Sequence, residues 1–363
     1  MPPIRIDIKT SLGSYAVWLG AGLAGRLDAL EQEAGLGSQR FLVSSPGIWR
    51  LHGDALSRAH PNAEVVLVPD GERAKQLQTV SKVYDALVHA AADRASVVIA
   101  VGGGVIGDMV GFAAATYLRG VALVHVPTTL LAQVDSAIGG KVGVNHPLGK
   151  NLIGAFYPPR FVCIDPSVLS TLPRRELRAG LYEVVKYGMI ANPDLFARID
   201  RDTHAIFACD PDALLAIIAE SCRIKAEVVS ADERESGLRR VLNFGHTAGH
   251  AIEAATSYRR FRHGEAVAYG MLAAAHLAVA RGVMPDADRQ ALATLIAKLG
   301  PLPSVTDLRV ADLLEAIRRD KKVIEGKLHF VLTTRIGETR IVDDVTEPEL
   351  AAALAAIGCR GAA

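Results

Sequence analysis

The sequence predicts an α/β domain with a mostly parallel, Rossmann-like sheet over residues 1–172, followed by a mainly α-helical domain over residues 173–363. In the first half, short β-branched and aliphatic runs alternate with helical stretches, which favours a parallel sheet covered on both faces. This alternation stops near Pro166, and helical patterns follow. A chain of 363 residues also exceeds the roughly 100–200 residues of one ordinary domain.

The elements of the first domain follow from local patterns. The N-terminal segment MPPIRIDIKT alternates apolar and polar residues, as an edge strand does. A helix is predicted at Lys75–Ala92. Inner strands are predicted, in chain order, at Phe41–Ser45, Ala63–Pro69, Val97–Val101, Ala122–Pro127 and Phe161–Asp165.

The second domain is predicted to be mostly helical. Pro and Gly break the chain at Ala191–Asp194 and Gly300–Thr306, where loops are expected. The segments Phe330–Leu332 and Glu338–Val342 fit a small hairpin. Helices are predicted at Arg175–Ile190, Pro211–Ala231, Gly245–Ala255, Gly264–Arg281 and Asp286–Leu299.

Composition argues against several classes of protein. The chain is 50% hydrophobic and 22% charged, as globular proteins are. A formal net charge of +1 gives no global attraction to nucleic acid or to an anionic membrane, so neither is an expected partner. No secretory signal and no run of roughly 18 apolar residues is present. The four cysteines lack CxxC spacing, so we expect a cytoplasmic enzyme with buried or incidental thiols.

A glycine-rich turn carries a dinucleotide-binding signal. The strand Val97–Val101 runs into GGGVIGD (residues 102–108), which contains the GxGxxG spacing. Such glycines permit a tight turn and bring backbone N–H groups close to a pyrophosphate. The acid that usually holds the adenosine ribose is missing after the next strand, Ala122–Val126, but a substitute is available within Asp70–Lys75. A glycine-rich packing turn is the alternative interpretation.

Three segments of the helical half concentrate metal-ligand side chains: LYEVVK (181–186), NFGHTAGH (243–250) and HGE (263–265). Two histidines and one carboxylate leave an open coordination position, as catalytic zinc sites do. His246 and His250 are spaced to share one face of a helix. Thr247 stands where the HExxH motif has its glutamate, so that motif is absent. Structural hydrogen bonding is the alternative role for these histidines.

Cationic residues beside glycines predict an anion site. Lys141 follows Gly139-Gly140, and Lys150 follows Gly149. A flexible backbone beside a cation suits a phosphate or carboxylate pocket. Lys225, Arg239 and the Lys321-Lys322 pair are further candidates, although a single Lys or Arg is more often a solvated surface charge.

Together these segments resemble the 3-dehydroquinate synthase family of sugar phosphate cyclases over nearly the whole chain, with glycerol dehydrogenase-like enzymes as a more distant match in architecture. The resemblance implies a dehydroquinate synthase-like fold. It is carried by GGGVIGDMVGFAAATYLRG (102–120), PTTLLAQVDSAIGGKVGVNHPLGKNLIGAF (127–156), RAGLYEVVKYG (178–188), RVLNFGHTAGHAIE (240–253) and HGEAVAYGM (263–271).

The resemblance implies that 3-deoxy-D-arabino-heptulosonate 7-phosphate is converted to 3-dehydroquinate and phosphate, a step of the shikimate pathway to chorismate and the aromatic amino acids. In that family NAD transiently oxidises the carbon 5 hydroxyl, which acidifies the carbon 6 proton and allows phosphate to be eliminated. Hydride then returns, and ring opening and an intramolecular aldol addition follow. A divalent metal polarises the reacting oxygens, and Zn²⁺ or Co²⁺ both suit such a site. Family members are commonly homodimers.

The resemblance also implies roles for individual residues. It implies Glu183, His246 and His263 as the metal ligands. For NAD it implies Asp70, Glu72 and Lys75 at the adenosine ribose, together with Gly103, Gly104, Val105, Ile106, Gly107, Asp108, Thr128, Thr129, Lys141, Lys150 and Thr171. For the substrate it implies Arg119, Asp135, Lys141, Lys150, Asn151, Lys186, Lys225, Arg239, Asn243, His250 and either Lys321 or Lys322.

Other functions are alternatives. A cyclase for another sugar phosphate, such as a valiolone-type or deoxy-inosose synthase, keeps the metal and NAD sites but alters the residues that hold the carboxylate and phosphate. An NAD-dependent polyol dehydrogenase shows net redox turnover. A non-catalytic anion-binding module has no use for Glu183, His246 and His263.

Overall fold

The structure is a computed structural model that describes residues 2–11, 13–321 and 329–361. The chain forms two compact units, one of Met1–Pro173 with Cys209–Arg234 and one of Arg174–Ala208 with Glu235–Ala363. This division differs from the expected domains, 1–172 and 173–363, in residues 209–234, which pack with the first unit. No helix among the described residues is long and apolar enough to cross a bilayer.

A seven-stranded sheet forms the first unit, with the strand order β1-β2-β9-β6-β5-β3-β4. Its strands are β1 (Ile4–Thr10), β2 (Gly13–Leu19), β3 (Arg40–Ser44), β4 (Glu64–Leu67), β5 (Val97–Gly102), β6 (Ala122–Pro127) and β9 (Phe161–Ile164). Only β1 and β2 pair antiparallel within this sheet. The mostly parallel sheet predicted from the sequence is therefore confirmed, whereas β2 was not predicted.

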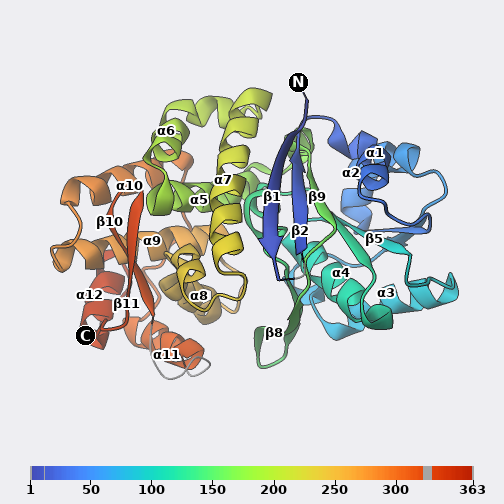
Figure 1. Cartoon of the computed structure of the whole chain (residues 1–363). Coiled ribbons are helices and arrows are strands. Elements are labelled where there is room, and N and C mark those ends of the chain that lie inside the picture. Colours follow the sequence, from blue (N-terminus) through green and yellow to red (C-terminus); the bar gives the residue numbers. More distant parts are fainter. Residues whose placement is uncertain (1, 12, 322–328, 362–363) are drawn as a thin grey trace. The chain divides into compact units, whose positions relative to one another are not determined.

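Helices cover both faces of this sheet (Figure 1). They are α1 (Leu27–Glu33), α2 (Pro46–Ala59), α3 (Leu77–His89) and α4 (Gly104–Thr116). Successive strand residues point to opposite faces. Thus Phe41 packs with residues of α3 and α4, whereas Leu42 packs with residues of α1 and α2. Short 3-10 helices occur at Leu23–Arg26, Glu72–Ala74, Tyr117–Arg119 and Pro166–Thr171, and a π-helix at Ala132–Ser136.

Helix α7 (Pro211–Ala231) belongs to the first unit although the chain enters it from the second. It lies alongside β1 (Figure 1). Just inside its C-terminus, Ser230 Oγ accepts a hydrogen bond from Lys9 N at 3.0 Å, and Glu233 Oε2 beyond it accepts one from Ser11 N at 2.7 Å. These long-range contacts explain why a division by sequence position alone assigned the helix to the wrong unit.

A separate hairpin of β7 (Lys141–His146) and β8 (Gly149–Phe156) occupies the segment where the sequence showed only glycine-rich turns. Gly143 and Gly154 face each other across it. A Cβ atom on Gly143 would lie 2.6 Å from Ile153 O, so the close pairing requires glycine at that position. Glycine weakens the usual strand signal, which accounts for the missed prediction.

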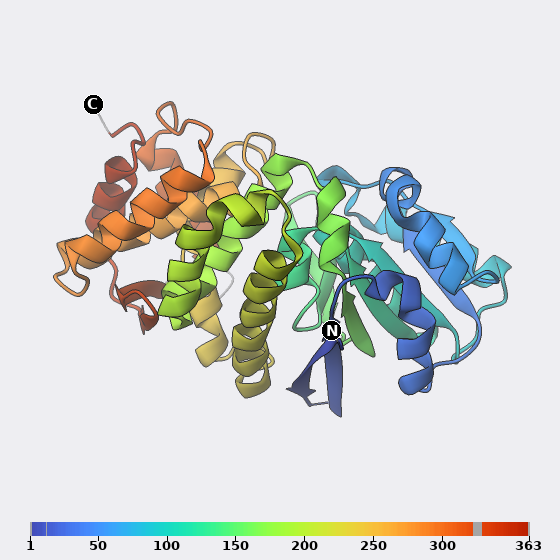
Figure 2. The same cartoon turned by 90° about the horizontal axis from the view of Figure 1, so that it is seen from above.

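The second unit is mainly helical, as predicted. Its elements are α5 (Arg174–Ala191), α6 (Pro193–Phe207), α8 (His246–Ala255), α9 (His263–Ala280), α10 (Asp286–Leu299), α11 (Val310–Lys321), α12 (Glu347–Ala356), the hairpin β10 (Phe330–Arg335) with β11 (Glu338–Val342), and a 3-10 helix at Leu238–Asn243. The buried helix α9 packs against α5, α8, α10, α12 and β10. Figure 2 shows the green helices α5 and α6 beside the orange α9 and α10.

Helix α6 occupies a region where the sequence predicted only a loop at Ala191–Asp194. Asn192 separates α5 from α6, and its Oδ1 atom caps the new helix by accepting a hydrogen bond from Leu195 N at 3.0 Å. Pro193 is the first residue of α6, a position where proline is favoured because its missing N–H would be unpaired anyway. The proline therefore starts a helix here.

Candidate active site

Close helix packing in the second unit brings the metal-ligand side chains together. Glu183 lies on α5, His246 begins α8, and His263 begins α9. A Cβ atom on Gly264 would lie 1.9 Å from Ala179 O on α5, and one on Gly270 would lie 1.7 Å from Gly245 O. Because these glycines let the backbones touch, α9 places His263 beside both other residues.

The distances among these side chains fit a metal centre. Glu183 Oε1 lies 3.8 Å from His246 Nε2 and 3.6 Å from His263 Nε2. Ligand atoms about 2.1 Å from a tetrahedral ion are about 3.4 Å apart, so a small inward shift would seat an ion among them. The structure thus brings together residues that are distant in sequence.

Hydrogen bonds at the far side of two rings fix their tautomers. His246 Nδ1 lies 3.2 Å from Phe244 O, and His263 Nδ1 lies 3.1 Å from Glu253 Oε2. A carbonyl oxygen and a carboxylate can only accept, so Nδ1 carries the proton in each ring. Both Nε2 atoms consequently direct a lone pair toward Glu183, as metal ligands require.

Glu183 is fully buried, and among the described residues no group donates a hydrogen bond of normal geometry to either of its carboxylate oxygens. Lys186, one helical turn along α5, places Nζ 2.5 Å from Oε2 as an ion pair. A buried carboxylate with an oxygen facing two imidazole lone pairs is costly unless a cation completes the group. The donor set and its burial therefore fit a divalent metal.

His250 joins the same cluster but is more exposed. Its ligand nitrogen lies within 4.8 Å of those of His246 and His263, and its ring centroid lies 5.4 Å from that of His246. Unlike the other two rings, which are half-buried, it is exposed to solvent. Exposure suits the predicted contact with a substrate, although the three nitrogens also form a possible ligand group.

The glycine-rich turn of the first unit lies between β5 and α4, as predicted. Helix α4 starts at Gly104 with no side-chain cap, so its first N–H groups are available to an anion. A Cβ atom would lie 3.1 Å from Thr129 Cγ2 if added to Gly103, and 2.8 Å from Ser136 Oγ if added to Gly104. Thr128 is anchored at the turn because its N–H donates to Gly102 O at 2.9 Å. These features fit a pyrophosphate cradle, while Gly102 also serves packing against Ile106.

A polar cluster adjoins the first turn of α4. The buried ammonium of Lys75 contacts Asp108 Oδ2 and lies 2.5 Å from Asn151 Oδ1. Burial raises the pKa of Asp108 above its ordinary value, and the adjacent Lys75 opposes that rise. The structure thereby connects the glycine turn with the β7–β8 hairpin, which carries Asn151.

The predicted ribose acids are in different surroundings. Glu72 Oε1 accepts from Asn145 Nδ2 at 2.7 Å and lies 3.6 Å from Lys150 Nζ, so it joins the hairpin residues. Asp70 is exposed, and its Oδ1 accepts from Gly71 N. Asp70 follows β4, an edge strand of the sheet. The glycine turn follows β5, whose neighbours are β3 and β6, so β4 and β5 are not adjacent.

The remaining predicted residues of the first unit occupy several positions. Lys225 on α7 donates to the main-chain oxygen and Oδ1 of Asp135, both at 2.6 Å. Lys225 therefore lies in the first unit, not in the second domain where the sequence division placed it.

Arg119 is exposed with φ +68°, next to Leu118 at φ +48°. Lys141 is exposed at the start of β7, while Thr171 Oγ1 lies 3.2 Å from His52 Nε2.

The second unit holds the other predicted substrate residues. Arg239 is buried in the 3-10 helix Leu238–Asn243. At its end, Asn243 Nδ2 donates to Glu235 Oε1 at 2.5 Å. Lys321 is the last residue of α11, and Lys322 lies outside the described residues.

Two residues near these groups were not singled out from the sequence. Glu253 follows His246 and His250 at the i, i+4, i+7 spacing that defines one helical face, a signal that was available. Ser136 has a buried hydroxyl close to Gly104, and the described part of the chain supplies no hydrogen-bond partner for it. Its position depends on the π-helix, for which the sequence gives no rule.

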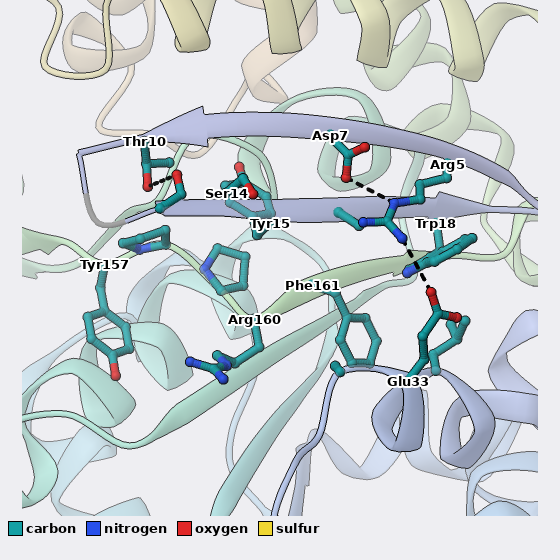
Figure 3. A pocket seen from close by; sticks show the side chains of 16 residues that line it. Arg5, Asp7, Thr10, Ser14, Tyr15, Trp18, Glu33, Tyr157, Arg160 and Phe161 are labelled. Carbon is teal, nitrogen blue, oxygen red and sulfur yellow. Dashed lines mark hydrogen bonds and ion pairs between the residues drawn. The ribbon is translucent and has the colours of Figure 1, made fainter.

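A pocket elsewhere in the first unit lies between the β1–β2 hairpin and the segment Tyr157–Phe161 (Figure 3). Arg5 donates to Glu33 Oε1 at one end, near Trp18. None of the predicted site residues lines this pocket.

Comparison with known proteins identifies the family. Residues 65–179 match the family model for the N-terminal part of 3-dehydroquinate synthase, and residues 180–323 match that for its C-terminal part. The chain belongs to the 3-dehydroquinate synthase family. The 3-dehydroquinate synthase of Picosynechococcus sp. is 49% identical over 333 residues, which cover 89% of this chain and 91% of that protein. The recognition made from the sequence is thus confirmed.

Solved structures of sugar phosphate cyclases share this fold. One is a 2-epi-5-epi-valiolone synthase from Streptomyces hygroscopicus with NAD⁺ and Zn²⁺ bound, which superposes with a TM-score of 0.87 at 30% sequence identity. The match covers 94% of this 3-dehydroquinate synthase family member and 96% of the valiolone synthase. A 2-deoxy-scyllo-inosose synthase with carbaglucose-6-phosphate, NAD⁺ and Co²⁺ has a TM-score of 0.86 at 28% identity, with coverage of 97% and 99%. The predicted fold class is therefore confirmed.

Proposed function

We propose that this enzyme converts 3-deoxy-D-arabino-heptulosonate 7-phosphate into 3-dehydroquinate and phosphate, using NAD catalytically and one divalent metal, Zn²⁺ or Co²⁺. Full-length similarity to 3-dehydroquinate synthases supports this reaction. The observation that carries the chemistry is the cluster of Glu183, His246 and His263 in a chain that also has the glycine turn at β5–α4.

The chain's own residues have two tasks at the metal centre. Glu183 and the Nε2 atoms of His246 and His263 would hold the ion, and three protein ligands would let the substrate reach it. Lys186 forms an ion pair with Oε2 of Glu183, so Oε1 is the oxygen that faces the two histidines and would contact the ion. When bound, NAD takes up and returns a hydride, while the metal stabilises negative charge on the substrate oxygen that reacts.

NAD is assigned to the residues around the glycine turn. Backbone N–H groups at the start of α4 bind the pyrophosphate. Glycine at position 104 avoids a clash with Ser136 Oγ beside this turn. Glu72, Lys75 and Asp108 form the polar wall beside this turn. Burial raises the pKa of Asp108, and the ammonium of Lys75 opposes that rise.

The substrate carries a phosphate and a carboxylate, which require cationic partners. We assign this task to a set of cationic and amide side chains, together with Asp135 and His250. The assigned set is Arg119, Asp135, Lys141, Lys150, Asn151, Lys186, Lys225, Arg239, Asn243, His250 and Lys321. In this set, Asp135 orients Lys225 through two hydrogen bonds to its ammonium.

The proposal includes a homodimer, which the family resemblance implies, and a location in the cytoplasm. Sedimentation equilibrium of the purified protein checks the dimer, and fractionation of cells that express it checks the compartment. A monomeric enzyme with full activity would contradict the first point.

Phosphate release measured with a substoichiometric amount of NAD tests the reaction. We expect many turnovers per NAD, no accumulation of NADH, and loss of activity after chelation of the metal. NADH rising in step with product would instead favour a polyol dehydrogenase. Phosphate release from glucose 6-phosphate or sedoheptulose 7-phosphate, but not from the heptulosonate, would favour another cyclase.

A further inference from the structure

Glu253 stands behind one proposed metal ligand. It lies on α8, only 4% exposed, and its Oε2 atom is 3.1 Å from Nδ1 of His263 on α9. The other nitrogen of that ring faces Glu183 Oε1 at 3.6 Å. Glu253 and the proposed metal position therefore lie at opposite nitrogens of the His263 ring.

The two histidines differ in what supports them. His246 Nδ1 faces the neutral main-chain carbonyl of Phe244, whereas His263 Nδ1 faces the side-chain carboxylate. An anionic acceptor pulls more strongly on the Nδ1 proton and so increases electron density at Nε2. His263 is thereby made the more basic ligand of the two. Because Glu253 supports His263 through its side chain, a substitution can remove this support. The main-chain carbonyl of Phe244, which supports His246, cannot be removed in this way.

We propose that Glu253 is a positioning residue for the metal: its carboxylate fixes the Nδ1–H tautomer and the orientation of His263 and strengthens Nε2 as a ligand. The inference rests on the proposed function, because it takes the ion to be held by Glu183, His246 and His263. It assigns Glu253 no contact with the ion or the substrate.

Zinc affinity of Glu253 variants tests the proposal. The apoprotein is prepared with a chelator, and Zn²⁺ is titrated in competition with a chromophoric chelator. We expect Glu253→Gln to weaken zinc binding about tenfold and Glu253→Ala by up to about 100-fold, as losses of such supporting groups do. Glutamine keeps an acceptor for Nδ1 but not the charge, so the pair of variants separates geometry from charge. If Glu253→Ala does not fold, Glu253→Gln decides.

The Co²⁺-loaded protein gives a second readout. Its visible absorption reports the ligand field, so we expect the Glu253→Gln spectrum to differ from that of wild type at saturating Co²⁺. A residue that only fills space would change the melting temperature and leave the spectrum unaltered. That result, together with wild-type zinc affinity in both variants, would overturn the inference.

Glu31 supplies a matched control in the first unit. It is also a fully buried glutamate beside a histidine, with Oε1 3.1 Å from His60 Nε2. Glu31→Gln makes the same chemical change away from the proposed ligands, so its zinc affinity is expected to equal that of wild type. An equal loss in Glu31→Gln would overturn the inference. A wild type that binds no divalent ion would overturn the proposed function, and this inference with it.

Discussion

His263 Nε2 lies 3.6 Å from Oε1 of Glu183, although the two residues belong to different helices. Gly264 permits this approach, because its missing Cβ leaves room for the main-chain oxygen of Ala179 on α5. Residues that share no local sequence pattern are thus held at a separation suited to a common ligand. The consequences for metal binding are directly measurable.

Replacing His246 or His263 with Ala is expected to abolish metal binding and activity together, because each removes one of three protein ligands. His250→Ala is expected to keep about one metal ion per chain while lowering kcat or raising KM, since this exposed ring is assigned to the substrate. Metal analysis of the purified variants checks both outcomes. Metal loss in the His250 variant with retention in the His263 variant would show that His250, and not His263, is a metal ligand.

Gly104→Ala is expected to have two separable effects. The new Cβ would lie 2.8 Å from Ser136 Oγ, so overpacking should cost about 1–3 kcal/mol of stability. Adding Ser136→Ala removes that hydroxyl, which is buried without a partner, and should restore the melting temperature. NAD affinity should fall at least about tenfold in both the single and the double variant, because the proposed function places the pyrophosphate against the backbone at Gly104, where a side chain would obstruct it. Recovery of NAD affinity in the double variant would place the whole effect in the clash with Ser136.

His125 is expected to make the protein sensitive to acid. It is buried on β6 beneath Gly107 of α4, and burial lowers its pKa from 6.5 to about 4. Between these pH values the unfolded chain binds a proton that the folded chain does not, so stability is full above pH 6.5 and declines as the pH falls toward 4. From pH 7 to pH 5 this one residue should cost about 2 kcal/mol.

Urea unfolding at the two pH values measures that cost. His125→Gln, which keeps a polar group but does not titrate, should show a loss smaller by about 2 kcal/mol than wild type. Other histidines with lowered pKa, such as His52 and His276, are present in both proteins and cancel in the comparison. Equal losses in the two proteins would show that His125 is protonated in the folded state.

Much of the fold follows from local patterns in the sequence. The inner strands and the helices α3, α5, α7, α9 and α10 were predicted close to their observed positions because apolar periodicity reflects burial directly, whereas α2 and α6 were not predicted. Helix α7 has the predicted bounds, Pro211–Ala231, yet its unit was wrongly expected, since only contacts with β1 decide where it packs. The β7–β8 hairpin was missed because glycines that permit close strand pairing also resemble turn residues.

The candidate site was predictable to different degrees. The turn at Gly102–Asp108 and the His246–His250 spacing are local signals that need no knowledge of the fold. The approach of Glu183 to His263 depends on helix packing, so the residues alone did not reveal it and the family resemblance supplied the pairing. Glu253 was visible as the next position on the His246–His250 face, but its contact with His263 on another helix was not.

Arg239→Lys is expected to lower kcat/KM at least about tenfold, on the order of 1.4 kcal/mol, although the charge is kept. Arg239 is buried in the 3-10 helix Leu238–Asn243, where its side chain has little freedom to rearrange. The planar guanidinium binds a carboxylate or phosphate through two parallel hydrogen bonds, which a lysine ammonium cannot reproduce.

Inhibition constants for two competitive analogues, one without the phosphate and one without the carboxylate, identify the group that Arg239 holds. The analogue that lacks this group should bind wild type and variant equally, while the other loses as much affinity as the complete ligand. If both analogues lose affinity by the same factor as the complete ligand, Arg239 contacts neither group and does not belong to the substrate site.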